Sequence, residues 1–199
     1  MVQAAPTTGR NGHGDAGVRE DIFCAALACF DRHGMRRTTM DDVAAAAGVS
    51  RKTVYNYFDN KTSLVGEVVA REARRVADEA RAELDLGLPA ADLVVAAEMA
   101  LLGAARRSPY VEMLLGPDAV TLTADAVDHS ELIGKVQSDY WRPILEPLRK
   151  KLRTGNLAEL IEWLTFFHFV LVARPATFEG SPERTRKMLR LYLVPAILR

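Results

Sequence analysis

Apolar residues recur at helical spacing along most of the chain, and no stretch alternates between apolar and polar residues between hairpin turns. This pattern predicts an all-α protein. The expected helices span residues 18–33, 40–47, 51–58, 61–84, 92–107, 130–152 and 156–173, with a short helix ending at Leu115 and a last helix after Ser181. Residues 117–128 are predicted to be irregular, and Pro143 and Pro147 to bend or interrupt the helix 130–152.

The stretch from Thr38 to Leu64 carries the clearest local signals. Thr39 followed three residues later by Asp42 predicts capping-box-like chemistry at the start of the helix 40–47. Gly48 suits the left-handed position after a helix, and Ser50 suits the N-cap of the next one. Two short helices joined by a three-residue turn form a helix-turn-helix.

The second helix of this motif is rich in hydrogen-bond donors. Only Val54 and Phe58, at i and i+4, are expected to face inward. Cations, amides, hydroxyls and phenols suit phosphates and base edges in a major groove, and Lys61 adds a cation beside the N-terminus of the next helix. We therefore predict DNA contacts by Arg51, Lys52, Thr53, Tyr55, Asn56, Tyr57 and Lys61. The alternative is a solvated surface helix.

The run Thr39, Val43-Ala44, Ala47-Gly48-Val49-Ser50, Thr53-Val54-Tyr55, Tyr57-Phe58, Lys61 and Leu64 resembles the signature of the TetR family of bacterial transcriptional regulators. Ile22, Ala25, Ala26, Phe30 and Gly34 match the first helix of that family's DNA-binding domain. The resemblance is specific over residues 22–64 and implies that Thr39 and Ser50 join the operator contacts named above. Many members carry a glycine where Lys52 stands, and the extra cation could bind a phosphate or read a guanine.

Charge is balanced over the whole chain, with 26 Lys and Arg against 26 Asp and Glu. A neutral total gives no general attraction to nucleic acid, so affinity must come from local charge. Residues 32–61 hold six cations (Arg32, Arg36, Arg37, Arg51, Lys52, Lys61) against three acids (Asp41, Asp42, Asp59). The excess of positive charge therefore lies around the predicted helix-turn-helix.

The remaining features predict a soluble cytoplasmic protein without a membrane segment, metal or cofactor. Cys24 and Cys29 lie five residues apart on one predicted helix, on different sides, as expected of small apolar residues in a reducing compartment. Residues 1–17 are polar, without the apolar core of a secretory signal, and are predicted to be a disordered arm. The longest uncharged apolar run, 163–173, has 11 residues, whereas a membrane helix needs about 20.

The helix 61–84 is expected to belong to two cores. Residues 18–64 are predicted to form the DNA-binding domain and residues 65–199 a ligand-binding and dimerisation domain. The helix 156–173 is apolar nearly all round and has to be buried on both sides. This predicts a homodimer paired as a four-helix bundle, which the resemblance also implies. The expected interface residues are Leu160, Leu164, Phe167, Met188, Leu191 and Tyr192. The alternative is a terminal helix folded over its own core.

A small-molecule effector is expected in a mostly apolar cavity with a few polar groups. Its candidate lining residues are the large, partly polar side chains of Tyr110, Met113, Tyr140, Trp141, Trp163 and Phe166, together with Leu114. Ordinary core packing is the alternative for each of them. His168 is expected to be a buried core residue that has found a partner.

No catalytic motif was found: the chain has no Gly-x-Ser-x-Gly elbow, His-Glu-x-x-His pair, phosphate-binding glycine loop or cysteine cluster. The sequence thus predicts a DNA-binding transcriptional regulator that is not an enzyme. We expect a dimeric repressor that binds double-stranded palindromic operator DNA and is released by a small, largely apolar ligand. The alternatives are an architectural or ligand-independent DNA-binding dimer, which a closed core would favour, and a helical enzyme.

Overall fold

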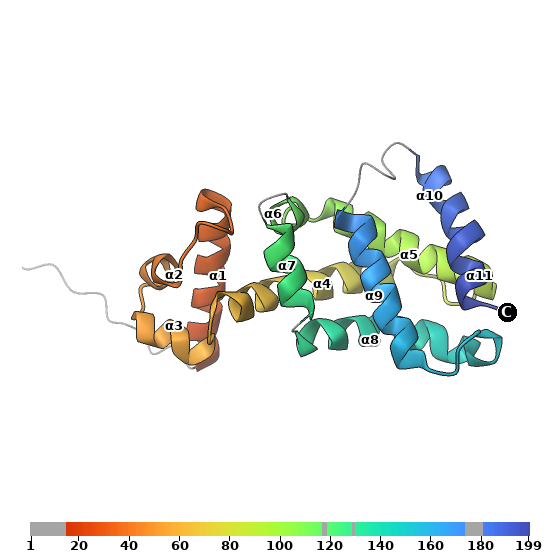
Figure 1. The fold of residues 1–199 in the computed structure, drawn as a ribbon, viewed down its shortest axis with the longest axis horizontal. Helices are drawn as coiled ribbons and strands as arrows, with labels where there is room; N and C mark the ends of the chain where they lie inside the picture. The colour runs from red at the N-terminus through yellow and green to blue at the C-terminus, as the bar shows by residue number, and fades with distance from the viewer. Residues whose placement is uncertain (1–14, 117–118, 129, 174–180) are drawn as a thin grey trace, which may run out of the picture.

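The computed structural model describes residues 15–116, 119–128, 130–173 and 181–199. These residues form helices, turns and one isolated bridge between Leu152 and Leu198. At one end of the elongated molecule α1 (Asp15–His33), α2 (Met40–Ala47) and α3 (Arg51–Tyr57) form a small group, from which α4 (Lys61–Ala82) leads into the larger group (Figure 1). No helix of this described part is long and apolar enough to cross a membrane.

The larger group begins with α5 (Ala90–Arg107), α6 (Val111–Leu115) and α7 (Val120–Asp128). It continues with α8 (Glu131–Leu145), a 3₁₀ helix (Glu146–Lys151) and α9 (Leu157–Ala173). At the C-terminal end α10 (Pro182–Met188) passes through a π-helical turn (Leu189–Leu193) into α11 (Val194–Ile197). Helix α4 packs against α5, α7 and α8, so it is the axis of this group.

Two sequence predictions about these elements are wrong. Residues 15–17, assigned to a disordered arm, belong to α1, while residues 1–14 lie outside the described part. Residues 120–128, predicted to be irregular, form α7, and the Val120 amide donates to the Gly116 carbonyl at 2.9 Å. The predicted interruption of the helix 130–152 is confirmed at Pro147, beside which α8 gives way to the 3₁₀ helix, whereas Pro143 lies inside the last turn of α8 without ending it.

Local capping fixes the helix-turn-helix as the sequence indicated. Thr39 Oγ1 accepts a hydrogen bond from the Asp42 amide at 3.2 Å, and Asp42 Oδ2 accepts one from the Thr39 amide at 2.8 Å. Gly48 takes the left-handed conformation with φ of 66°, and Ser50 Oγ accepts from the Thr53 amide at 3.0 Å. These contacts confirm both predicted caps and set the turn between α2 and α3.

Two hydrophobic cores share α4. Its first half, with Leu64 and Val68, closes the core built by α1, α2 and α3, where Ile22, Phe30 and Val54 are buried. Its second half, from Val76 onward, belongs to the core formed with α5, α8 and α9. One continuous helix therefore contributes to both cores. The domain division between residues 64 and 65 stays a prediction.

An ion-pair network fastens α1 to α4. Glu67 accepts hydrogen bonds from Arg19 at 3.0 Å and from Arg71 at 2.8 Å, and Arg71 also pairs with Glu20. Burial raises the pKa of Glu67, but the bonds from Arg71 and Arg19 outweigh it and hold this pKa below its usual value. The small group is therefore tied to the first turns of α4 by charge as well as by apolar packing.

Candidate DNA-binding and ligand-binding sites

The exposed surface of α3 gathers the predicted DNA contacts. Val54 and Phe58 are buried beneath it. Arg51, Lys52, Tyr55 and Asn56 are exposed on α3, Thr39 and Ser50 are exposed at the caps of α2 and α3, and Thr53, Tyr57 and Lys61 are partly covered. All nine residues predicted to contact DNA thus lie on α3 or at the caps of α2, α3 and α4.

Besides the capping side chains of Thr39 and Ser50, those of Arg51, Tyr57 and Lys61 are held by neighbours. The Arg51 guanidinium pairs with Asp41 of α2, with Nε 3.0 Å from Oδ1 and Nη1 3.1 Å from Oδ2, and lies 5.5 Å from the Tyr55 ring centre. The Tyr57 hydroxyl donates to Asp15. Lys61 Nζ donates to the Arg36 carbonyl at 2.9 Å, and partial burial lowers the pKa of this lysine.

A cavity of about 100 Å³, partly open to the surface and called the interior cavity below, lies among α4, α5, α6, α7, α8 and α9. Most of its wall is apolar, including Val69, Val76, Leu101, Ala105, Val111, Leu114, Leu115, Val127, Ile133, Phe169 and Val172. Its polar lining residues are Glu72, Thr123, Gln137, Thr165 and His168. An apolar cavity with a few polar groups has the character of a small-molecule site.

The polar groups of this wall differ in how well they are paired. Thr123 and Thr165 donate to the carbonyls of Leu114 and Ile161, at 2.6 and 2.8 Å. His168 Nδ1 lies 2.8 Å from Oε1 of Glu98, which is completely buried. The expectation that His168 is buried with a partner is confirmed. Its place in a cavity wall was missed, although an acid at position 98, inside the otherwise apolar run of α5, was a usable signal.

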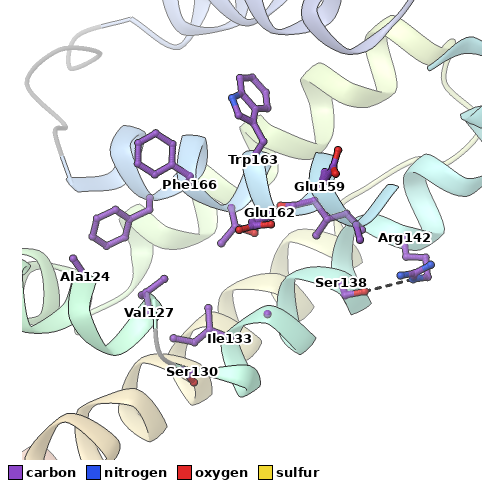
Figure 2. Close-up of a pocket in the computed structure, with 15 residues that line it drawn as sticks. Ala124, Val127, Ser130, Ile133, Ser138, Arg142, Glu159, Glu162, Trp163 and Phe166 are labelled. Carbon is purple, nitrogen blue, oxygen red and sulfur yellow. Dashed lines mark hydrogen bonds between the residues drawn. The ribbon is translucent and has the colours of Figure 1, made fainter. Parts of the chain in front are cut away.

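A wider groove of about 820 Å³ lies outside the cavity, between α9 and the α7–α8 segment (Figure 2). Trp163 and Phe166 of α9 line it, and Glu159, Glu162 and Arg142 supply its charged side chains. Phe169, Thr165, Val127 and Ile133 line both the groove and the cavity. The cavity and the groove are therefore separated only by shared wall residues, of which Phe169 is the largest.

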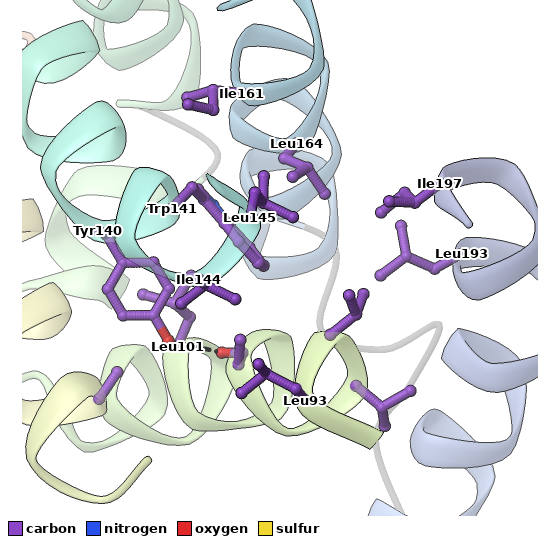
Figure 3. Close-up of a cluster of buried hydrophobic side chains, with 14 of the residues drawn as sticks. Leu93, Leu101, Tyr140, Trp141, Ile144, Leu145, Ile161, Leu164, Leu193 and Ile197 are labelled. Atoms are coloured by element: carbon purple, nitrogen blue, oxygen red, sulfur yellow. Dashed lines mark hydrogen bonds between the residues drawn. The ribbon is translucent and has the colours of Figure 1, made fainter. Parts of the chain in front are cut away.

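Of the seven residues predicted to line a ligand cavity, Leu114 lines the interior cavity and the other six do not. Tyr140 and Trp141 are fully buried in the larger core, where their rings meet edge to face at 5.3 Å (Figure 3). The Tyr140 hydroxyl donates to the Ala97 carbonyl at 2.9 Å, and burial raises the pKa of Tyr140. Trp163 and Phe166 line the outer groove, Met113 packs against the first core and Tyr110 is exposed.

The residues predicted for a dimer interface are also divided. Leu160 and Leu164 are buried in the core of their own chain, so the structure contradicts their assignment to an intermolecular surface. Phe167 and Met188 are half-buried, whereas Leu191 and Tyr192 are exposed. The outer face of α9 instead carries Trp163, Phe166 and Val170, at i, i+3 and i+7, which are exposed by 44%, 66% and 38%. An apolar helix of this kind gives no hydrophobic contrast from which its orientation could be predicted.

Comparisons with known proteins agree with this architecture. The model of the family described as bacterial regulatory proteins, tetR family, matches residues 22–68. Over 51 residues the chain is 42% identical to a probable acrEF/envCD operon repressor of Escherichia coli strain K12, a match covering 26% of this chain and 23% of that protein. Over 137 residues it is 31% identical to the uncharacterized HTH-type transcriptional regulator YhgD of Bacillus subtilis strain 168, covering 67% of this chain and 66% of that protein.

A solved structure extends the similarity over nearly the whole chain. Thermus thermophilus FadR, a TetR family transcriptional repressor solved in complex with lauroyl-CoA, is 29% identical, with a TM-score of 0.56. The superposition covers 91% of this chain and 96% of that one. The match to the E. coli relative, by contrast, leaves more than three quarters of that protein unmatched.

Proposed function

Because the chain belongs to the TetR family of bacterial regulatory proteins, we propose that it is a sequence-specific DNA-binding repressor. The observation that carries this proposal is the exposed face of α3, where Arg51, Lys52, Tyr55 and Asn56 surround a helix anchored by Val54. A helix of this size and composition fits a major groove, where such groups bind phosphates and base edges. The repressor would act in the cytoplasm, where bacterial operators are.

The repressor acts as a homodimer in this proposal. The exposed apolar residues Trp163, Phe166 and Val170 of α9 and Leu191 and Tyr192 near the C-terminus supply a surface for a two-fold partner. A self-complementary surface of this kind is usual in symmetric dimers. The two α3 helices would then enter successive major grooves about 34–36 Å apart, or a multiple of this, on an inverted-repeat operator.

Release from the operator is assigned to a small ligand in the interior cavity. Val69, Glu72 and Val76 of α4 form part of the cavity wall, and α7 packs against the same helix, with the Ala126 carbonyl 3.8 Å from where a Cβ on Gly66 would be. A ligand that enlarges the cavity would therefore displace α4, which carries the small group. The lauroyl-CoA complex of the Thermus protein supports an effector with a substantial apolar part.

The proposal is tested by measuring binding to an inverted repeat from the DNA next to the gene, over a range of salt concentrations. Tyr57→Phe and Lys61→Ala should weaken binding to every sequence, because both lose phosphate contacts. Lys61→Ala should also flatten the salt dependence, because one cation fewer releases fewer counterions. Arg51→Ala and Asn56→Ala should relax base preference, by about 1–3 kcal/mol for each lost bidentate contact.

The control variant is Lys135→Ala, which removes an exposed cation from α8, away from α3. It should bind the operator like the parent protein. If the three α3 variants and Lys61→Ala also bind like the parent, α3 is not the DNA-reading helix and the proposal is wrong.

A further inference from the structure

We propose that the effector is an uncharged or cationic molecule with a compact apolar body and at least one hydrogen-bond donor, and that anions are disfavoured. This inference rests on the proposed function, because it concerns the ligand of the interior cavity. Its basis is the set of buried polar atoms on α5, α8 and α9, which are mainly acceptors.

Gln137 is the clearest of these groups. Its side chain lines the cavity and is only 7% exposed, and Oε1 has no hydrogen-bond partner among the described residues. A buried acceptor without a partner lowers stability, so most are paired in folded proteins. A donor on a ligand inside the cavity would supply the missing bond.

His168 of the cavity wall is paired with Glu98, which lies behind it and outside the wall. Glu98 Oε2 is buried without a partner among the described residues. Because Glu98 does not line the cavity, Gln137 Oε1 is the acceptor that a ligand donor would meet there.

The charges around the cavity disfavour an anion. Glu72 lies in the wall and Glu98 lies directly behind His168. Arg75 pairs with Glu72 at 2.7 Å and with Glu79 at 2.9 Å, and Glu79 also pairs with Arg107 at 2.6 Å, so Glu72 is neutralised by a cation that it shares. A buried anionic group would meet these carboxylates without a free cation at the cavity wall, which costs binding energy.

The groove outside the cavity has the same bias. Its charged lining residues are Glu159 and Glu162 against the single Arg142. A polyanionic head group left outside the cavity would therefore meet two acids and one cation. Both compartments favour an effector with no negative charge.

The size of the cavity limits the apolar body. A cavity of about 150 Å³ holds benzene, so the 100 Å³ found here suits a narrower body. Benzene has six non-hydrogen atoms, so about four fit this space, and a six-atom probe would extend past the shared wall toward the groove. Larger effectors would have to displace Phe169, the residue shared with the groove.

Four matched probes test this inference on the full chain without DNA: 1-pentanol, pentylamine, butyl methyl ether and pentanoate. Binding is measured by calorimetry and by chemical-shift titration. Pentanol and pentylamine should bind about three- to tenfold more tightly than the ether, which accepts but does not donate a hydrogen bond. Pentanoate should bind more weakly than all three.

Gln137→Met removes the acceptor at nearly constant side-chain volume. In this variant the preference for pentanol over the ether should fall to about half or less of its original ratio. Ser138→Ala is the matched control, because Ser138 is the next residue on α8 and lines the groove but not the cavity. It should keep the parent preference.

The inference is overturned if pentanoate binds as tightly as pentanol, if the ether equals pentanol, or if no probe binds to the parent protein. An unchanged donor preference in Gln137→Met also overturns it, and the parent series decides alone if that variant does not fold. The proposed function fails differently. In that case pentanol binds as expected, yet the protein binds no inverted repeat or its operator affinity is unaffected by any ligand.

Discussion

A single charge on the outer face of α9 should split the proposed dimer. Phe166 is 66% exposed in the isolated chain, on a helix face that also exposes Trp163. A phenylalanine buries about 200 Å² when fully covered, so about 130 Å² remains for a partner. At about 25 cal/mol per Å², complete burial contributes about 3 kcal/mol from each protomer, or about 6 kcal/mol per dimer.

Phe166→Glu removes this contribution and adds two carboxylates to the interface. Because about 1.4 kcal/mol corresponds to tenfold in affinity, the dissociation constant should rise by about four orders of magnitude. Sedimentation velocity over a concentration series measures this directly. Circular dichroism checks that the helices remain, since Phe166 contributes little to the core of its own chain.

The matched control for this prediction is Leu132→Glu. Leu132 is a similarly exposed apolar residue, at 47%, but it lies at the start of α8 beside the small group. This variant should remain a dimer. A dimer that survives in Phe166→Glu, or that dissociates equally in Leu132→Glu, would refute the assignment of the outer face of α9 as the interface.

Three further predictions concern stability. Gly48→Ala should destabilise the chain by about 1 kcal/mol, because φ is 66° at Gly48. Gly134→Ala should stabilise it by up to about 1 kcal/mol, because Gly134 lies inside α8 with no atom within 4 Å of an added Cβ. Urea unfolding measures both changes. Glu67→Gln should lower the free energy of unfolding at pH 7, because the pKa of Glu67 is depressed in the folded protein. The difference from the parent should shrink as the pH falls below the unfolded-state pKa of about 4.3. Urea unfolding at several pH values tests this. In the Phe166→Glu background, Leu164→Ala should cost about 2–5 kcal/mol and Trp163→Ala much less, and equal costs would contradict the orientation of α9.

The helix-turn-helix was predictable from the sequence because its signals are local. Thr39 with Asp42, Gly48 and Ser50 each act within four residues of their own position, so their chemistry determines where α2 and α3 begin and end. The burial of Val54 was equally predictable from the sequence, because its neighbours are polar. Where local signals were mixed, as in 120–128, the helix depends on packing against α4 and could not be anticipated.

The orientation of α9 could not be derived because nearly every position is apolar. Leu160 and Leu164 face the core of the chain. Trp163 and Phe166, one and two residues from Leu164, face outward. Their side chains have similar hydrophobicity, so only the position of α5 and α8 decides which of the two faces is covered. The prediction that both faces need a partner stands independently of this error. In the proposed dimer, the partner would cover the exposed aromatic residues of α9.

Side-chain size did not predict which residues line the cavity proposed as the ligand site. A polar residue within an otherwise apolar helix would have been the better signal. Large aromatic residues such as Tyr140 and Trp141 fill a core efficiently, and both are buried in the larger core. The cavity is instead bounded by small and medium apolar residues from six helices, a combination that no local pattern reveals. Glu98 stands within an otherwise apolar run, and burial of an acid there requires a partner from elsewhere in the chain. That partner is His168, and it lies in the cavity wall. An ionisable residue on a buried helix face is therefore the better starting point for locating a binding site in a helical domain of this kind.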